Sequence, residues 1–185
     1  MRPVAVALVW AGIMNIAYRE GPYTPWRWAR PCNAYGRWLV VHDPGNDAAQ
    51  PGQILQYLRT NPKHDSYGEF VWLEGDTMKV VKLCPDWQYT GHAGVATRIP
   101  GTTIRNTAVN WWTYSTSICT YGKRLPAAAL EAFAQHLAIR VGELGLPDAG
   151  VILAHREIST VPGRRSDPRG IDMNELRAEV AKHLR

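Results

Sequence analysis

Two short, entirely apolar runs along the chain each end in a histidine. Residues 38–41 (WLVV) precede His42, and residues 151–154 (VILA) precede His155. Short apolar runs that stop at turn formers or polar residues predict strands that are buried on both faces. We therefore expect two imidazoles at the carboxyl ends of two buried strands.

Longer segments with apolar residues three or four positions apart predict helices. The clearest covers residues 126–144, with a proline at its start and a glycine after its end. Two more are expected over residues 47–60 and 172–184. We expect His136, on the clearest helix and near polar neighbours, to be solvated.

Further strands are predicted where β-prone residues cluster. The runs at 69–73 and 77–83 flank Glu74-Gly75-Asp76, a pattern typical of a hairpin. Val, Trp, Thr, Tyr and Ile over residues 108–119 predict one more strand. Because strands alternate with helices, we predict an α/β fold: a single domain with a mixed central β-sheet flanked by helices.

The first 36 residues differ from the rest. Residues 4–17 are largely apolar and predict a buried first strand or helix rather than a signal peptide, since they follow one positive charge and contain an asparagine. Residues 18–36, rich in Pro, Gly, Arg and aromatics, predict an irregular surface arm. We expect residues 1–36 to be a strand and arm that pack on a domain formed by residues 37–185.

Composition excludes several classes of protein. Apolar types make up 45% and charged types 20% of the 185 residues, which excludes a mainly disordered or fibrous chain. No apolar run is long enough to span a membrane. The net charge of +5 favours polyanionic surroundings, but the basic residues are dispersed, so nucleic acid is not the expected partner. Three cysteines without a CxxC pair do not indicate a disulfide scaffold.

The two strand-end histidines are candidate metal ligands. In open α/β sheets, ligands bind at the rim where the carboxyl ends of the strands meet. Asp167, 12 residues after His155, is the obvious third group, and two His with one carboxylate leave Zn²⁺ an open position for water. A structural hydrogen-bonding role for each histidine is the alternative at this point.

Several ordered motifs then resemble those of the zinc-dependent N-acetylmuramoyl-L-alanine amidases, found among bacteriophage endolysins, bacterial wall-recycling amidases and peptidoglycan recognition proteins. The strand ending in His42 is similar to the strand that carries the family's first zinc ligand. The other similar segments are Ser66-Tyr67 (the family's SYH, with Gly68 in place of His), His92-Ala93-Gly94 (HAG), Leu125-Pro126, Ala154-His155-Arg156-Glu157 (GHRE) and Asp167-Pro168 (K-x-D-P). The resemblance covers about residues 37–185, which would be the amidase catalytic domain.

The resemblance implies an activity and roles for particular residues. The family hydrolyses the amide between N-acetylmuramic acid and L-alanine of the peptidoglycan stem peptide. His42, His155 and Asp167 would bind zinc at the rim of the sheet. Tyr67 stands where phage-type members carry a catalytic tyrosine, and Arg165 stands where the family has a lysine that stabilises the oxyanion. His92 would line the substrate groove rather than bind metal.

One departure from the family concerns the general base. Many members carry a glutamate on a central strand, and Ser115 lies near that position here. Glu69, two residues from Tyr67, would share a face with Tyr67 on a regular strand and is therefore a candidate replacement base.

The leading hypothesis is a phage endolysin that stays in the host cytoplasm before lysis and then acts on bacterial peptidoglycan. We expect a monomer without stable membrane insertion. A peptidoglycan-binding recognition module without catalysis is the main alternative. A cysteine hydrolase that uses Cys84 or Cys119 is a third.

Overall fold

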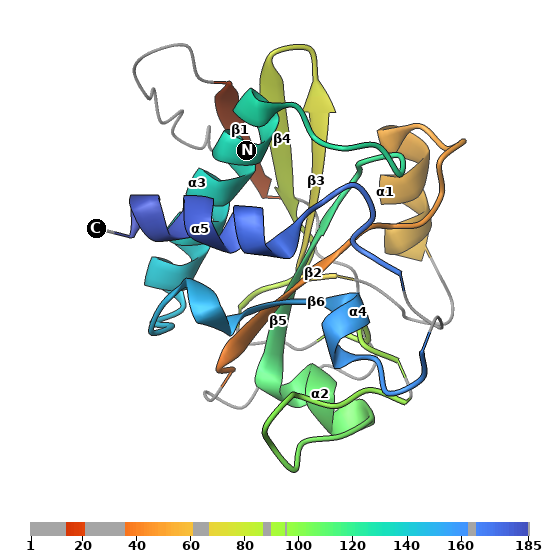
Figure 1. Cartoon of the computed structure of the whole chain (residues 1–185). Helices are drawn as coiled ribbons and strands as arrows, with labels where there is room; N and C mark the ends of the chain where they lie inside the picture. The colour runs from red at the N-terminus through yellow and green to blue at the C-terminus, as the bar shows by residue number, and fades with distance from the viewer. Residues whose placement is uncertain are drawn as a thin grey trace.

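A mixed sheet runs through the centre of the computed structural model, which describes residues 14–20, 36–60, 67–86, 90–94, 96–162 and 166–184 (Figure 1). Its strands lie in the order β1-β4-β3-β5-β2-β6, and only the β3–β4 hairpin is antiparallel. The bounds are β1 Asn15–Glu20, β2 Trp38–His42, β3 Glu69–Glu74, β4 Thr77–Lys82, β5 Thr113–Ile118 and β6 Ile152–Ala154. The predicted α/β class, the mixed sheet and the hairpin are confirmed.

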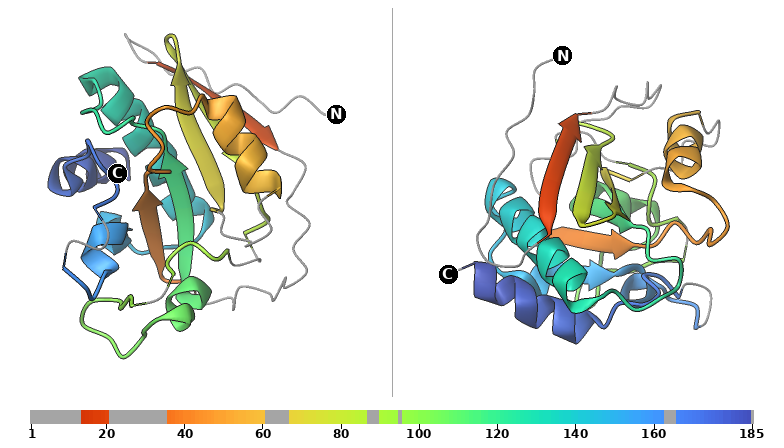
Figure 2. Two further views of the ribbon diagram at one scale, coloured as in Figure 1. Left: turned by 90° about the vertical axis from the view of Figure 1, so that its right-hand side faces the viewer. Right: turned by 90° about the horizontal axis from the view of Figure 1, so that it is seen from above.

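Helices cover both faces of the sheet. α3 (Ala127–Glu143) and α5 (Met173–His183) pack together on one face, and α1 (Pro51–Thr60) lies on the other (Figure 2). Two short helices, α2 (Thr107–Trp112) and α4 (His155–Ile158), adjoin β5 and β6. None of the helices in the described ranges is both long enough and apolar enough for a membrane span.

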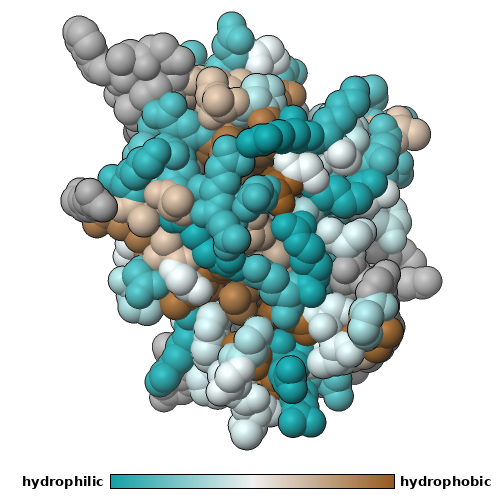
Figure 3. Space-filling view, in the orientation of Figure 1, coloured by the Kyte–Doolittle hydropathy of each residue, from teal (hydrophilic) through white to brown (hydrophobic). Residues whose placement is uncertain are grey.

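The alternation of side chains along the strands explains this layering. Val71 of β3 joins the apolar cluster under α3, whereas its neighbour Phe70 packs with Ile54 and Leu58 of α1. Successive strand residues point to opposite faces, so β3 serves both layers. On the face of the molecule seen in Figure 3, hydrophilic side chains are interspersed with small apolar areas.

The predicted strand over residues 108–119 is wrong in its first half. Residues 107–112 form α2, and β5 begins only at Thr113. The local preference of Val and Trp for strands is overridden by contacts with the loop before α2: Val109 is fully buried there, and the Asn110 side chain accepts a hydrogen bond from the Ala93 amide at 2.8 Å. The helix predicted over residues 47–60 begins only at Pro51, a residue suited to the first helical position.

The apolar N-terminal segment contributes a strand. β1 pairs in parallel with β4, from Asn15 opposite Thr77 to Glu20 opposite Lys82, and Ile16 joins the main core. Residues 15–20 are therefore part of the sheet, and the expectation of an irregular arm is wrong for residues 18–20, which belong to β1. Residues 21–35 of the expected arm lie outside the described residues, so its surface role stays a prediction.

Candidate active site

His42, His155 and Asp167 converge at one edge of the sheet. β2 and β6 pair in parallel with Val41 opposite Ala154, so the residues that follow, His42 and His155, emerge side by side. The Nδ1 atoms of both rings lie 3.1 Å from the same oxygen, Oδ2 of Asp167. One ligand atom from each of the three residues lies within 4.8 Å of the other two. The convergence predicted from the strand ends is confirmed, and the three residues form a possible metal site.

The donor set itself fits a divalent cation. Nε2 of His155 lies 3.0 Å from the backbone carbonyl of Ala93, which can only accept, so a neutral His155 carries its proton there and presents a lone pair at Nδ1. That lone pair faces the carboxylate oxygen of Asp167. Electron-rich atoms at this distance need either a proton or a metal cation between them. Two imidazoles and one carboxylate are a set that binds zinc and leaves a coordination position open.

The protonation state of Asp167 suits this role. Burial raises the pKa of its carboxyl, but His155 and His42, when their rings carry a proton on Nδ1, donate hydrogen bonds and positive charge that outweigh burial and lower the pKa far below its ordinary value. Asp167 is therefore a carboxylate at neutral pH, which is the form that ligates metals.

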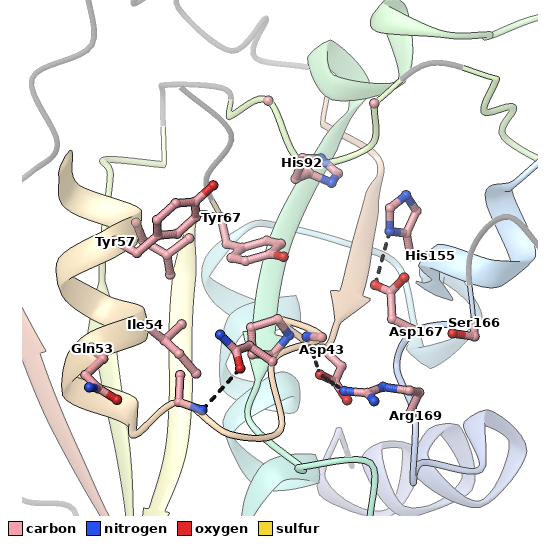
Figure 4. A pocket seen from close by; sticks show the side chains of 17 residues that line it. Asp43, Gln53, Ile54, Tyr57, Tyr67, His92, His155, Ser166, Asp167 and Arg169 are labelled. Carbon is pink, nitrogen blue, oxygen red and sulfur yellow. Dashed lines mark hydrogen bonds and ion pairs between the residues drawn. The ribbon is translucent and has the colours of Figure 1, made fainter. Parts of the chain in front are cut away.

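A cavity of about 890 Å³ is lined by His155 and Asp167 of this cluster, and its size suits a small molecule or a peptide segment (Figure 4). One wall is formed by α1 with Ile54 and Tyr57, and His92, His155 and Asp167 lie across the cavity from it. Polar groups thus gather on one side and apolar or aromatic groups on the other.

Tyr67 reaches this cavity from the segment before β3. Its ring lies 5.0 Å from the His42 ring, measured between centroids, and packs against the cluster under α1. Gly68 sets this approach: a Cβ there would lie 2.8 Å from the backbone oxygen of Ser115, and the Gly68 amide donates to the Ser115 hydroxyl at 3.0 Å. This close approach leaves no room for a side chain at residue 68.

Asp43 and Arg169 join the two chain segments that carry His42 and Asp167. The Asp43 carboxylate accepts from Arg169 at 3.0 Å, from the Thr120 hydroxyl at 2.7 Å and from the Gly45 amide at 2.7 Å. Arg169 also forms two hydrogen bonds with Asp47. Asp43 and Arg169 are 126 positions apart, so this pairing exists only in the folded chain.

The remaining predicted groups differ in placement. His92 is buried, and both its ring nitrogens have protein partners: Nδ1 lies 2.9 Å from Nε2 of His42, and Nε2 lies 2.8 Å from the Thr113 hydroxyl. His92 therefore offers the cavity only its carbon edge. Arg165 lies outside the described residues.

Comparison with known proteins places this site in a family. A family model described as N-acetylmuramoyl-L-alanine amidase matches residues 33–170, three quarters of the chain and all three candidate ligands. The chain belongs to the N-acetylmuramoyl-L-alanine amidase family. A comparison with curated protein sequences finds no match.

Solved structures share the fold of this amidase-family chain at low sequence identity. The Staphylococcus aureus hydrolase AmiA in complex with its ligand has a TM-score of 0.66 at 16% identity, covering 94% of this chain and 85% of that one. The E. coli amidase AmiD, in complex with a muramyl-peptide substrate, has a TM-score of 0.59 at 17% identity, and the match covers 83% of this chain and 59% of that one. The Ph2119 endolysin from a Thermus scotoductus bacteriophage has a TM-score of 0.58 at 14% identity, and the match covers 89% of this chain and 99% of that one.

Glu69 of this amidase-family protein faces away from the cavity. Its carboxylate accepts from His136 Nε2 at 3.0 Å and pairs with Arg140 Nε at 2.7 Å, both on α3. Because the chain bends at Gly68, Glu69 and Tyr67 point to opposite sides of the sheet, and the expected shared face is not found. The expectation that His136 is solvated is also wrong, since His136 is fully buried against this carboxylate.

The cysteines in the described part of this amidase-family chain do not form a nucleophilic site. Cys84 and Cys119 are buried, and neither lines the cavity beside the histidines. Burial raises the pKa of the Cys119 thiol, which disfavours the reactive thiolate.

Proposed function

We propose that this protein is a zinc-dependent N-acetylmuramoyl-L-alanine amidase that hydrolyses bacterial peptidoglycan. The observation that carries the proposal is the convergence of His42, His155 and Asp167 in a chain of this family, with His155 and Asp167 lining an open cavity. When bound by these residues, zinc supplies Lewis-acid polarisation of the scissile carbonyl and lowers the pKa of a bound water.

The protein's own groups then divide the remaining work. The α1 wall and the opposite polar side would hold the muramyl peptide between them, with its scissile amide above the histidines. The phenol of Tyr67 would donate a hydrogen bond to the oxygen that gains negative charge in the transition state. Arg165, two residues before Asp167, would add a permanent positive charge and no transferable proton. Glu69 serves the fold and not the reaction.

Tyr67→Phe is expected to lower the rate of amide hydrolysis by about 10²-fold or more, since removal of one oxyanion donor has effects of this size. Zinc affinity should be unchanged. Tyr121→Phe is the matched control, because Tyr121 packs against the same apolar cluster without lining the cavity. Equal rates of amide hydrolysis for Tyr67→Phe and Tyr121→Phe would show that the Tyr67 hydroxyl takes no part in the reaction.

We further propose a phage endolysin that is held in the host cytoplasm and acts as a monomer on peptidoglycan. The likeness to a phage endolysin supports this origin, and the net charge of +5 would favour an anionic wall. The non-catalytic recognition module is the second candidate. The serine near the family's central glutamate position favours it, and that serine, Ser115, is already bonded to Gly68 and Thr90.

Digestion of purified sacculi tests the activity directly. The expected products are stem peptides with a free L-alanine amino group and glycans with free lactyl carboxylates, identified by mass spectrometry. A chelator should stop their release, and added zinc should restore it. Wall binding without new amino groups would support the recognition module, and cut glycan chains with intact lactyl amides would reject an amidase.

A further inference from the structure

A chain of hydrogen bonds connects the candidate ligand His42 to the helix before β5. Nε2 of His42 lies 2.9 Å from Nδ1 of His92, and Nε2 of His92 lies 2.8 Å from Oγ1 of Thr113. Oγ1 of Thr113 lies 2.7 Å from the carbonyl oxygen of Val109 in α2. All four residues are buried. The chain therefore has a fixed set of partners and little access to water.

The direction of each bond follows from the last one. A carbonyl oxygen only accepts, so the single hydroxyl proton of Thr113 goes to Val109. Oγ1 of Thr113 must then accept from His92, which places the His92 proton on Nε2. A neutral His92 has no second proton, so its Nδ1 accepts from Nε2 of His42. The proton of a neutral His42 is thus on Nε2, and its Nδ1 lone pair faces Asp167.

We propose that His92 and Thr113 are positioning residues that fix His42 as the Nε2–H tautomer and so present its Nδ1 to the metal. The adjacent Ala93 carbonyl does the same for His155, so one short loop orients both imidazoles. This assignment rests on the proposed zinc site and deepens it. Groups that orient metal ligands in this way contribute about 10- to 100-fold to metal affinity.

Thr113→Val is expected to weaken zinc binding by about 10- to 100-fold. Valine cannot accept the His92 proton, which then moves to Nδ1 and opposes the Nε2–H of His42. Thr113→Ser keeps the hydroxyl and should restore affinity close to that of the wild type. The measurement is the zinc Kd of metal-free full-length protein, by competition with a chromophoric chelator at fixed pH.

Thr116→Val is the matched control. Thr116 lies on the same strand and is equally buried, and its hydroxyl has no hydrogen-bond partner in the described parts of the chain. The same substitution there should leave the zinc Kd unchanged. Melting curves of the metal-free variants separate loss of fold from loss of affinity. Equal zinc affinity for Thr113→Val and Thr116→Val would overturn the assignment.

A second readout concerns the tautomers themselves. Long-range ¹H–¹⁵N spectra of the zinc-loaded wild type should show His42 and His92 each protonated on Nε2. A proton on Nδ1 of His92 would overturn the assignment even if Thr113→Val binds zinc weakly. Wild-type protein that binds no zinc would reject the proposed function as well, whereas normal zinc binding that is insensitive to Thr113→Val rejects this assignment alone.

Discussion

Asp167→Asn is expected to remove tight zinc binding and to lower the rate of amide hydrolysis by on the order of 10³-fold. A bound metal stabilises the transition state by several kcal/mol, and each ~1.4 kcal/mol corresponds to a tenfold change in rate. Asparagine keeps the shape of the side chain but removes the negative charge on which both Nδ1 atoms converge at 3.1 Å. Zinc content after dialysis and the release of stem peptides from sacculi measure the two effects.

The same substitution nearby provides the control. Asp172 caps α5 by accepting from the amides of Asn174 and Glu175, and asparagine is an equally good cap. Asp172→Asn should therefore leave zinc content, activity and stability unchanged. An Asp167→Asn protein with wild-type zinc content and activity would contradict the proposed site.

Glu69→Ala is expected to reduce the free energy of unfolding by about 1 to 3 kcal/mol, because it leaves Nε2 of buried His136 without its partner, while Arg140 keeps Asp86 and Glu143. Denaturant unfolding measures this loss. Activity per folded molecule should stay at the wild-type level, since Glu69 faces α3 and not the cavity. Glu143→Ala, which removes an exposed partner of Arg140, should cost no more than about 1 kcal/mol.

The contribution of Glu69 should depend on pH. Burial raises the pKa of its carboxyl, but the charge and hydrogen bond of His136 and the charge of Arg140 outweigh burial, so the pKa lies below its ordinary 4.5. A lowered folded-state pKa stabilises the fold above the unfolded value and loses this effect as the pH falls through the folded value. The stability gap between wild type and Glu69→Ala should therefore be full at pH 7 and should shrink below about pH 4.5. A gap that does not change with pH, or a fall in specific activity, would contradict a purely structural role.

The parts that the sequence predicts well depend on local patterns. Apolar runs that end at His42 and His155 fix both the strands and the point where each imidazole emerges, and parallel pairing of those strands brings the rings together. The hairpin around Gly75 and the long helix before Gly145 likewise follow from turn formers and apolar spacing.

Features that depend on contacts between residues far apart in the chain could not be predicted from the sequence. The bend at Gly68 turns Glu69 away from Tyr67, and it exists because the Ser115 backbone lies against it. The pairing of Arg169 with Asp43 joins residues 126 positions apart. Residues 107–112 read locally as a strand and become helical through burial of Val109. No local pattern encodes these contacts.

The position of β1 has a practical consequence for anyone who shortens this protein. A version trimmed to the family-matched residues 33–170 would lose β1 and α5 together. Removal of β1 would leave the backbone groups of β4 unpaired along a bare edge, which invites self-association of the sheet. Loss of α5 would uncover apolar side chains on α3, which packs against it. A protein expressed with only the family-matched residues would therefore tend to aggregate, and a shortened version should keep residues 14–184.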